Sequence, residues 1–448
     1  MKVLTISFYK DFARYFYYVQ QVAAKRCDQV EFDNFVLYPC ARHYFSTKGV
    51  NSTLLPDCIS AVEHVGDNYR GYNLDNLIGY SLKTFKNAPS ELKQYFASRA
   101  AGYVDYFEGL FSMNRYEYVV CAGDTRIPVE VCAAVAKRNG VKVWYFEQGP
   151  FGTTIIDHMG VNANVSFNGV NGGRSGCGGS FDIAAFLQNI KQKGGGKYWL
   201  AEKRTVMDHL ANLRTLLTMH PPKILSRYYP LELSDGTYAS KFVFQLVKER
   251  FLRRNSQNSG TIANGSAVPY VALLLQVPHD AQMLLHSPSY DDVVEMVKDV
   301  LASLPSGYRL IIREHPLHKG RYSQNLYSIV SSSNVCQIDN ASPLSALIDQ
   351  SAVVVVNNST TGLDAMIRFK TVVVLGNAYY ANDKVTYPVK PGDQLKEKLL
   401  AAIEHPIPTS EIKDYLMWLL SDVLIAGHFQ DLYLHNADVI IDKVARTS

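Results

Sequence analysis

Polar side chains that could act on an anionic substrate follow two strand-like runs in the first third of the sequence. The stretches are Gly123-Asp124-Thr125-Arg126 and Phe146-Glu147-Gln148-Gly149-Pro150. A carboxylate at the end of a strand can serve as a general base or a nucleophile, so Glu147 and Asp124 are candidate catalytic residues. The structural alternatives are that Asp124 caps the helix predicted to begin near Ile127, and that Glu147 is a solvated loop residue.

Two later stretches place histidines beside charged groups. One is Leu275-Gln276-Val277-Pro278-His279-Asp280, with His286 shortly after it, and the other is Arg313-Glu314-His315-Pro316. A cation and an imidazole at a strand end could hold a phosphate or a carboxylate. The alternatives are a hydrogen-bonded loop capped by Asp280 and a histidine with a purely structural role.

A fifth stretch has the residue types that cradle a phosphate. The valines 353–356 lead into Asn357-Asn358-Ser359-Thr360-Thr361-Gly362 and then into a predicted helix. Small hydroxyl residues and glycine at a helix N-terminus expose backbone N–H groups, and the helix dipole favours negative charge there. This pattern suits the phosphate of a nucleotide sugar, and ordinary Ser/Thr capping is the alternative.

A sixth stretch, residues 241–254, carries five cationic residues and one acidic residue mixed with aromatic ones. It could lie on an anionic membrane surface. The interpretation we favour is a basic surface helix whose apolar stripe packs on the protein.

An alternation of strands and helices positions these stretches. The apolar patterns predict strands at 3–8, 30–37, 116–122, 141–146, 270–277, 308–313, 352–356 and 371–375, with helices between most of them. This rhythm predicts an α/β protein with two Rossmann-like, doubly wound domains and parallel sheets. Such sheets bind ligands where the carboxyl ends of their strands meet a crevice, so an interdomain cleft is expected. The expected domains are 1–265, with a helical and partly basic insertion at 170–255, then 266–425, and a C-terminal helix in 426–448 that returns to the first domain.

Composition narrows the class of protein. The chain has 448 residues, of which 47% are hydrophobic and 19% charged, so it can bury a large core. A net charge of +4 is too small to indicate nucleic acid as a partner, but it is compatible with anionic substrates or an anionic membrane. No apolar run reaches the roughly 18 residues that span a bilayer. The seven cysteines form no CxxC pair, which suits a reducing cytosol, and the start of the chain reads as a strand and not as a signal peptide.

Taken together, the motifs resemble the capsular polysaccharide synthesis family of bacterial β-Kdo transferases, of the KpsS/LipB kind. The resemblance covers most of the chain outside 170–265. Its landmarks are, in order, Gly123-Asp124-Thr125-Arg126, Tyr145-Phe146-Glu147-x-Gly149, Gly160-Val161-Asn162, Leu275-Gln276-Val277 with Asp280, Gln282 and His286-Ser287, Glu314-His315-Pro316 with Gly320-Arg321-Tyr322, and Asn358-Ser359-Thr360-Thr361-Gly362 followed by Val374-Leu375-Gly376.

The resemblance implies a GT-B-type glycosyltransferase that uses CMP-Kdo and starts a Kdo linker on a phosphatidylglycerol-like lipid. It implies a cytoplasmic protein, peripheral at the inner face of the cytoplasmic membrane, with other capsule synthesis or export proteins as further partners. Glu147, Asp124 and His315 are then expected in catalysis. The expected donor-binding residues are Arg126, which would pair with the sugar carboxylate, and Gln276, Asp280, His286, Arg313, Pro316, Asn358, Ser359, Thr360, Thr361 and Gly362.

No cofactor or metal is required by this interpretation, because the sequence has no compact carboxylate cluster of the D-x-D kind in a convincing setting. His315, Arg313 and backbone N–H groups would instead assist departure of the CMP phosphate. Two other functions stay open. One is a nucleotide-sugar epimerase of the same shape, which needs no acceptor, and the other is a non-catalytic partner in capsule assembly or export.

Overall fold

The computed structural model describes residues 1–26, 30–63, 65–85, 88–172, 204–236, 238–252, 268–278, 280–430 and 437–446. The chain divides into two compact units. Unit 1 comprises Met1–Val161, Lys193–Val243 and Leu424–Ser448, and unit 2 comprises Asn162–Gln192 and Phe244–Val423. One boundary between the units falls between residues 243 and 244, inside helix α8 (Ala239–Leu252). The sequence pattern places the boundary between residues 265 and 266. The residues 255–260, whose Asn, Ser and Gly content predicts a flexible linker, lie outside the described residues, as do the glycines 194–196.

Unit 1 contains a seven-stranded sheet in the order β15-β8-β7-β6-β1-β2-β3. Its strands are β1 (Lys2–Ser7), β2 (Glu31–Val36), β3 (Thr53–Leu54), β6 (Tyr118–Ala122), β7 (Lys142–Gln148), β8 (Thr153–Asp157) and β15 (Ile425–Ala426). The five neighbouring strands β7, β6, β1, β2 and β3 pair in parallel, whereas β8 is antiparallel to both β7 and β15. The strand order reverses between β1 and β6, which makes this a doubly wound sheet.

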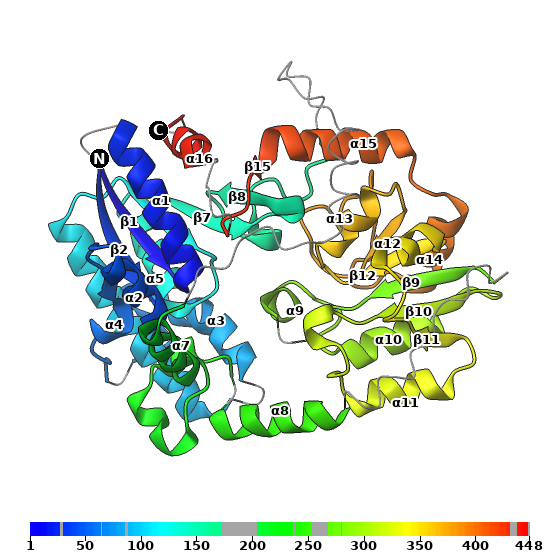
Figure 1. Cartoon of the computed structure of the whole chain (residues 1–448), viewed down its shortest axis with the longest axis horizontal. Helices are drawn as coiled ribbons and strands as arrows, with labels where there is room; N and C mark the ends of the chain where they lie inside the picture. Colours follow the sequence, from blue (N-terminus) through cyan, green and yellow to red (C-terminus); the bar gives the residue numbers. More distant parts are fainter. Residues whose placement is uncertain are drawn as a thin grey trace. The chain divides into compact units, whose positions relative to one another are not determined.

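Helices cover both faces of the unit 1 sheet (Figure 1). They are α1 (Lys10–Arg26), α2 (Pro39–Thr47), α3 (Leu74–Thr84), α4 (Ser90–Met113), α5 (Ile127–Arg138), α7 (Val206–Met219) and α16 (Ala437–Arg446), with short 3-10 turns η1 (Leu55–Asp57), η2 (Pro150–Gly152), η4 (Lys223–Tyr228) and η5 (Leu231–Leu233), and a small hairpin of β4 (Asn68–Tyr69) and β5 (Tyr72–Asn73). Alternate strand residues enter different cores: Val143 and Tyr145 join the core that contains α3, α4 and α5, and Trp144 and Phe146 join the core that contains α1 and α2.

The C-terminal segment packs on the α1 side of unit 1. Ile440 of α16 is buried in the same core as α1 residues. At the end of α1, Arg26 pairs with Asp438 at 3.3 Å and with Asp442 at 2.6 Å. Because these ion pairs are exposed, most of the stabilisation comes from the buried apolar contact.

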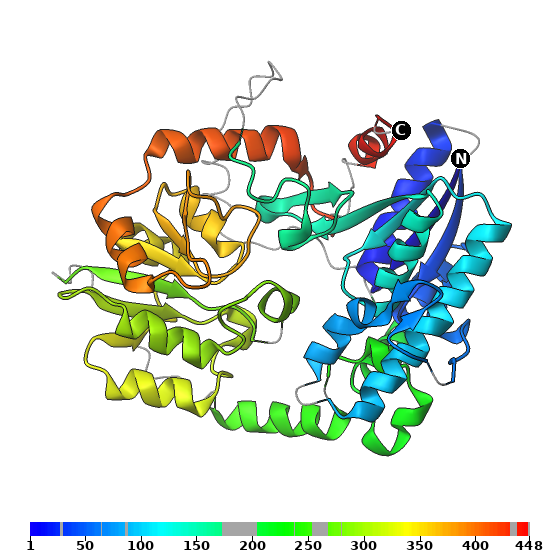
Figure 2. The ribbon, with the colours of Figure 1, turned by 180° about the vertical axis from the view of Figure 1, so that it is seen from behind.

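Unit 2 contains a six-stranded sheet in the order β11-β10-β9-β12-β13-β14, and every pairing in it is parallel. Its elements are η3 (Asn162–Asn164), β9 (Tyr270–Leu274), α9 (Ala281–Leu285), α10 (Val293–Ala302), β10 (Arg309–Arg313), η7 (Pro316–His318), α11 (Gln324–Ser332), β11 (Cys336–Ile338), α12 (Leu344–Gln350), β12 (Val353–Val356), α13 (Thr361–Met366), β13 (Val372–Val374), β14 (Tyr387–Pro388), α14 (Leu395–Glu404), α15 (Thr409–Trp418) and the π-helical turn η8 (Leu419–Val423). Helices α10, α11 and α14 share one core with alternate residues of the central strands. Figures 1 and 2 show the strands and helices of this unit from two opposite sides. Numbered from β9, the order is 3-2-1-4-5-6, the doubly wound order of dinucleotide-binding domains.

The predicted α/β class with two doubly wound, largely parallel sheets is confirmed in both units. The sequence pattern missed the β4–β5 hairpin and the strands β3, β8, β11, β14 and β15. Of these, β3, β11, β14 and β15 are edge strands of the two large sheets, and β8 lies next to the edge strand β15. Edge strands are short, and their pairing depends on a neighbour that local periodicity does not reveal. Within the described residues, no helix is both long and apolar enough to cross a membrane.

Two glycines of α4 give a test of this packing. Alanine at Gly102 would place its Cβ 2.2 Å from the carbonyl oxygen of Ser60, whereas nothing lies within 4 Å of a Cβ at Gly109. We expect Gly102→Ala to lower the free energy of unfolding by about 1–3 kcal/mol, because the helix must move away from the loop. Gly109→Ala should be neutral or stabilising by up to about 1 kcal/mol. Denaturant unfolding of the two variants measures the difference, and equal stabilities would contradict this packing.

Candidate functional site

The strand order of unit 2 reverses between β9 and β12, and this is where polar side chains gather. Gln276 follows β9, and Asn357 and Asn358 follow β12. Gln276 donates from Nε2 to Oδ1 of Asn358 at 2.8 Å, which joins the ends of the two strands. Ligands of doubly wound sheets bind outside the carboxyl ends of the strands at such a reversal.

Asn358 is the centre of this network, and its side chain is only 2% exposed. Its Oδ1 accepts from Gln276, and its Nδ2 donates to the backbone oxygens of Gln282 and His286, each at 2.9 Å. These bonds fasten α9 to the end of β12. Because the described contacts use both ends of the amide, Asn358 acts in this structure as a support for the loops around the site.

The loop after β10 is held by a buried carboxylate. Glu314 is 2% exposed, and it accepts hydrogen bonds from the Tyr327 hydroxyl at 2.6 Å, from the Gly320 backbone at 3.1 Å and from the Asn340 amide. A buried charge is tolerated when donors satisfy it in this way. Glu314 thereby fixes the loop that carries His315.

His315 is the titratable group that this loop presents. Its Nδ1 accepts a hydrogen bond from the Leu317 backbone at 3.2 Å. Burial lowers the pKa of His315, and the charge of Asp280 opposes that shift. The imidazole is therefore neutral at pH 7, and because Nδ1 is an acceptor, its proton must be on Nε2. His315 can then donate Nε2–H to an anionic oxygen.

Tyr322 connects the His315 loop to the reversal point. Its hydroxyl accepts from the His315 backbone at 3.2 Å and donates to the Gln276 backbone oxygen at 3.1 Å. Sequence reasoning named Tyr322 only as a landmark and missed both Glu314 and Tyr322 as supports, because a buried acid or tyrosine looks like any other in a sequence.

Arg313 ends β10, and the hydroxyl residues 359–361 follow β12, with β9 between these two strands in the sheet. Arg313 donates to the backbone oxygens of Asp339 at 3.0 Å and Ser342 at 2.8 Å, so its guanidinium holds the loop after β11. Ser359 accepts from the backbone N–H of Thr361 at 3.3 Å and from its hydroxyl at 2.9 Å. Thr360 and Pro316 are exposed, Asp280 is exposed at the N-cap of α9, and His279 lies outside the described residues.

A polar hollow of about 540 Å³ lies on the β13 side of this network. It is lined by Asn168, Gly169, Asn171, Gly376, Asn377, Ala378, Ala381, Asn382, Asp383, Lys384, Pro388, Val389, Lys390 and Pro391. Gly376 borders both features: a Cβ there would lie 2.7 Å from Oδ1 of Asn357 and 2.8 Å from the oxygen of His286. The hollow therefore adjoins the reversal point. Sequence reasoning missed its asparagines and lysines, because they come from segments more than 200 residues apart.

In unit 1 the strand order reverses beside Asp124. Asp124 is buried and accepts from the Val161 backbone at 3.1 Å, and the residue at the N-cap of α5 is Arg126. Arg126 is also buried, and its guanidinium donates to the Ser234 oxygen at 3.1 Å and forms an ion pair with Asp235. The described contacts therefore commit Arg126 to its own unit.

Glu147 lies within β7, which extends further than the sequence pattern predicted, and it pairs with Ile155 of β8. It is half-buried. Ala122 of β6 is in register with Phe146 of β7, and the Gly123 N–H donates to the Phe146 oxygen at 3.0 Å. The structure thus brings Asp124 and Glu147 to adjacent strand ends.

A further acid on α5 was not expected from the sequence. Burial, followed by the charge of Asp124, raises the pKa of Glu130 to about 8. Glu130 is therefore mostly protonated at pH 7. It lies on the helix that follows β6, and the ends of β6 and β7 carry the other two acids, Asp124 and Glu147. Perturbed acids of this kind are common at functional sites.

Comparison with known proteins agrees with these landmarks. The family model described as "Capsule polysaccharide biosynthesis protein" matches residues 117–429. The Escherichia coli capsule polysaccharide export protein KpsS is 28% identical over 175 residues, which are 37% of this chain and 43% of KpsS. The capsule polysaccharide modification protein LipB of Neisseria meningitidis serogroup A is 24% identical over 350 residues, 72% of this chain and 77% of LipB.

Among solved structures, the KpsC β-Kdo 2,7 transferase of Thermosulfurimonas dismutans is similar, with a TM-score of 0.38 and 16% identity. The alignment covers 77% of this chain and 90% of that one. A TM-score below 0.5 does not establish a common arrangement, so the relationship rests on the sequence match.

The support role of Asn358 is tested by an isosteric change. Asn358→Asp replaces the NH2 group that donates to two backbone oxygens with a carboxylate oxygen, which cannot donate and repels them. We therefore expect the free energy of unfolding to fall by about 3 kcal/mol or more. Asn377→Asp alters an exposed amide nearby and should change stability by less than about 0.5 kcal/mol. Thermal unfolding compares them, and equal effects would remove Asn358 from the central role.

Proposed function

The chain belongs to the capsule polysaccharide biosynthesis protein family, and from that premise we propose that it is a glycosyltransferase of capsule or surface polysaccharide synthesis. The proposed donor is a CMP-linked acidic sugar of the Kdo kind, and the proposed acceptor is a lipid or glycolipid such as phosphatidylglycerol. The family match over residues 117–429 is the observation that carries the proposal. The donor is the one implied by the family resemblance that the ordered landmarks at 123–126, 147–149 and 358–362 carry.

Unit 2 is the proposed donor-binding unit. Its reversal point and the adjoining hollow of about 540 Å³ offer a polar surface of the size that suits a nucleotide. Lys384 and Lys390 line that hollow and can attract the phosphate and the sugar carboxylate. The hydroxyls of Ser359 and Thr360 and the backbone N–H of Thr360 are the proposed phosphate contacts, because the N–H groups of Thr361 and Gly362 already donate to Ser359.

Transfer requires that the acceptor oxygen bonds to the anomeric carbon while the bond from that carbon to the phosphate oxygen of CMP breaks. The leaving phosphate takes the electron pair, and the Nε2–H of His315 is placed to stabilise the charge that develops there. Arg313 contributes positive charge to the same edge while its N–H groups hold the neighbouring loop. In this proposal no metal takes part.

Unit 1 is the proposed source of the reacting carboxylate. Glu147 accepts the proton of the acceptor hydroxyl, or attacks the anomeric carbon in a double displacement, with Asp124 as the second candidate. Arg126 has its guanidinium paired with Asp235, so its proposed role changes from binding the sugar carboxylate to positioning the loop that carries Asp124. The proposed location is the cytoplasmic face of the inner membrane, where a lipid acceptor is accessible.

Glu147→Gln tests the catalytic assignment. The amide keeps the size of the side chain but can neither accept a proton nor act as a nucleophile, so we expect transfer to fall by about 100-fold or more. Affinity for CMP and thermal stability should stay at wild-type values. The assay incubates CMP-Kdo with phosphatidylglycerol vesicles and separates the lipid product by chromatography.

The same assay distinguishes the alternatives. An epimerase would isomerise the sugar of a nucleotide donor without any acceptor, and a non-catalytic assembly partner would neither transfer nor hydrolyse the donor. Wild-type turnover by the Glu147→Gln variant would assign the chemistry to another residue, with Asp124 tested next.

His315→Asn tests the donor site. Asparagine can still accept from the Leu317 backbone, but it removes the Nε2–H donor, so we expect CMP to bind about 10-fold more weakly in calorimetry. The matched control is His405→Asn, an exposed histidine of unit 2, which should bind CMP like the wild type. Equal affinity in the two variants would exclude His315 from contact with the nucleotide.

A further inference from the structure

Helix α7 presents most of its large apolar side chains outward, whereas Leu217 and Met219 near its C-terminus are half-buried. Val206, Leu210 and Leu213 are exposed, at the i, i+4, i+7 spacing of one helix face, and Leu213 is 53% exposed. The residues that α7 buries are small or hydroxylic: Ala211, Thr215 and Thr218. An amphipathic helix of a water-exposed surface has the opposite arrangement.

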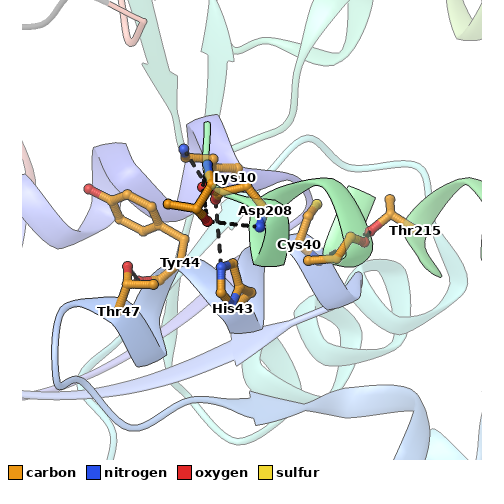
Figure 3. Close-up of polar contacts among 9 residues, drawn as sticks. Lys10, Cys40, His43, Tyr44, Thr47, Asp208 and Thr215 are labelled. Carbon is orange, nitrogen blue, oxygen red and sulfur yellow. Dashed lines mark hydrogen bonds and ion pairs between the residues drawn. The ribbon is translucent and has the colours of Figure 1, made fainter. Parts of the chain in front are cut away.

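Polar contacts fix α7 in this orientation (Figure 3). Oγ1 of Thr215 accepts from the Cys40 backbone of α2 at 3.1 Å. Asp208 forms a capping box with Thr205 and lies 3.6 Å from both Nζ of Lys10 and Nε2 of His43. Turning the leucines inward would break the contacts of Thr215 with Cys40 and of Asp208 with Lys10 and His43. The polar contacts of α7 with α1 and α2 therefore determine that these leucines face outward from unit 1.

The apolar surface continues into the turn η4 that follows α7. Ile224 is 91% exposed and Tyr228 67%, and Leu225 is also exposed. Lys223 and Arg227 are exposed between them. These exposed residues together are called the α7–η4 surface. Its apolar members are Val206, Met207, Leu210, Leu213, Leu216, Ile224, Leu225 and Tyr228, and its cations are Arg204, Arg214, Lys223 and Arg227.

The charge of this surface has one sign. From 204 to 230, all of which the structure describes, the cations are those four and the acidic residue is Asp208, which already faces Lys10 and His43. Cations set among exposed aliphatic and aromatic side chains match a bilayer surface, where apolar groups enter the acyl boundary and cations meet anionic headgroups.

We propose that the α7–η4 surface docks unit 1 on an anionic lipid bilayer. This inference deepens the proposed function by naming the surface that meets the membrane, and it rests on that function only for the identity of the acceptor lipid. The site is distinct from the basic stretch 241–254 that the sequence singled out.

Vesicle co-sedimentation of the full chain tests the proposal. Vesicles of phosphatidylcholine with about one third phosphatidylglycerol should bind the wild type, and binding should weaken with added salt or without the anionic lipid. We expect the double variants Leu213→Ser with Ile224→Ser, and Lys223→Gln with Arg227→Gln, each to weaken binding by about 10-fold or more.

Matched controls change the same chemistry elsewhere. Met113→Ser with Val335→Ser removes exposed apolar groups, and Lys396→Gln with Lys413→Gln removes exposed cations. Both control variants should bind vesicles like the wild type. Thermal unfolding and CMP affinity should be unchanged in all four double variants, which shows that the chain is folded and that the donor site is intact.

The proposal is overturned if the wild type does not sediment with the anionic vesicles, or if the two α7–η4 variants bind as the controls do. It is also overturned if sedimentation velocity shows a dimer that the same variants dissociate, because the surface is then an interface between protein copies. Vesicle binding that persists while no nucleotide sugar is transferred would instead reject the proposed function and leave this inference intact.

Discussion

The amide pair of Gln276 and Asn358 is the interaction on which the carboxyl edge of unit 2 depends. It joins β9 to β12 where the strand order reverses, and the remaining donors of Asn358 fasten α9 to the same point. Parallel strands at such a reversal separate their following loops, which opens space for a ligand. The amide network closes the base of that space without a charge, and Gly376 keeps it free of a side chain.

Buried polar groups throughout the protein hold exposed ones in place. Glu314 is saturated with donors, and the group it presents is His315. Arg126 is paired with Asp235 and supports the loop of Asp124. Asp208 holds α7 so that its leucines point outward. In each case a charged residue is the support that holds a neighbouring group in place.

The two units share the doubly wound strand order but differ in the strands at one edge of the sheet. Unit 2 keeps a fully parallel sheet, so all its strand ends lie on one edge beside the hollow. Unit 1 adds antiparallel β8 and β15 beyond β7, which places Glu147 inside a paired strand. Pairing restricts the backbone there, and a restricted backbone positions a carboxylate more firmly than a loop does.

The sequence alone determined the α/β class, the positions of the central strands and the family, because apolar runs such as 353–356 and the motifs that follow them are local patterns. It also identified the strand ends at which Asp124, Glu147, Gln276, His315 and Asn358 lie. Only the tertiary structure decided which of these side chains are used as supports, because hydrogen-bond partners such as Asp235 for Arg126 and His286 for Asn358 come from distant segments. The outward face of α7 was decided in the same way: its leucine spacing predicts a helix, but only the contacts of Thr215 and Asp208 with α1 and α2 determine which side of that helix meets the protein.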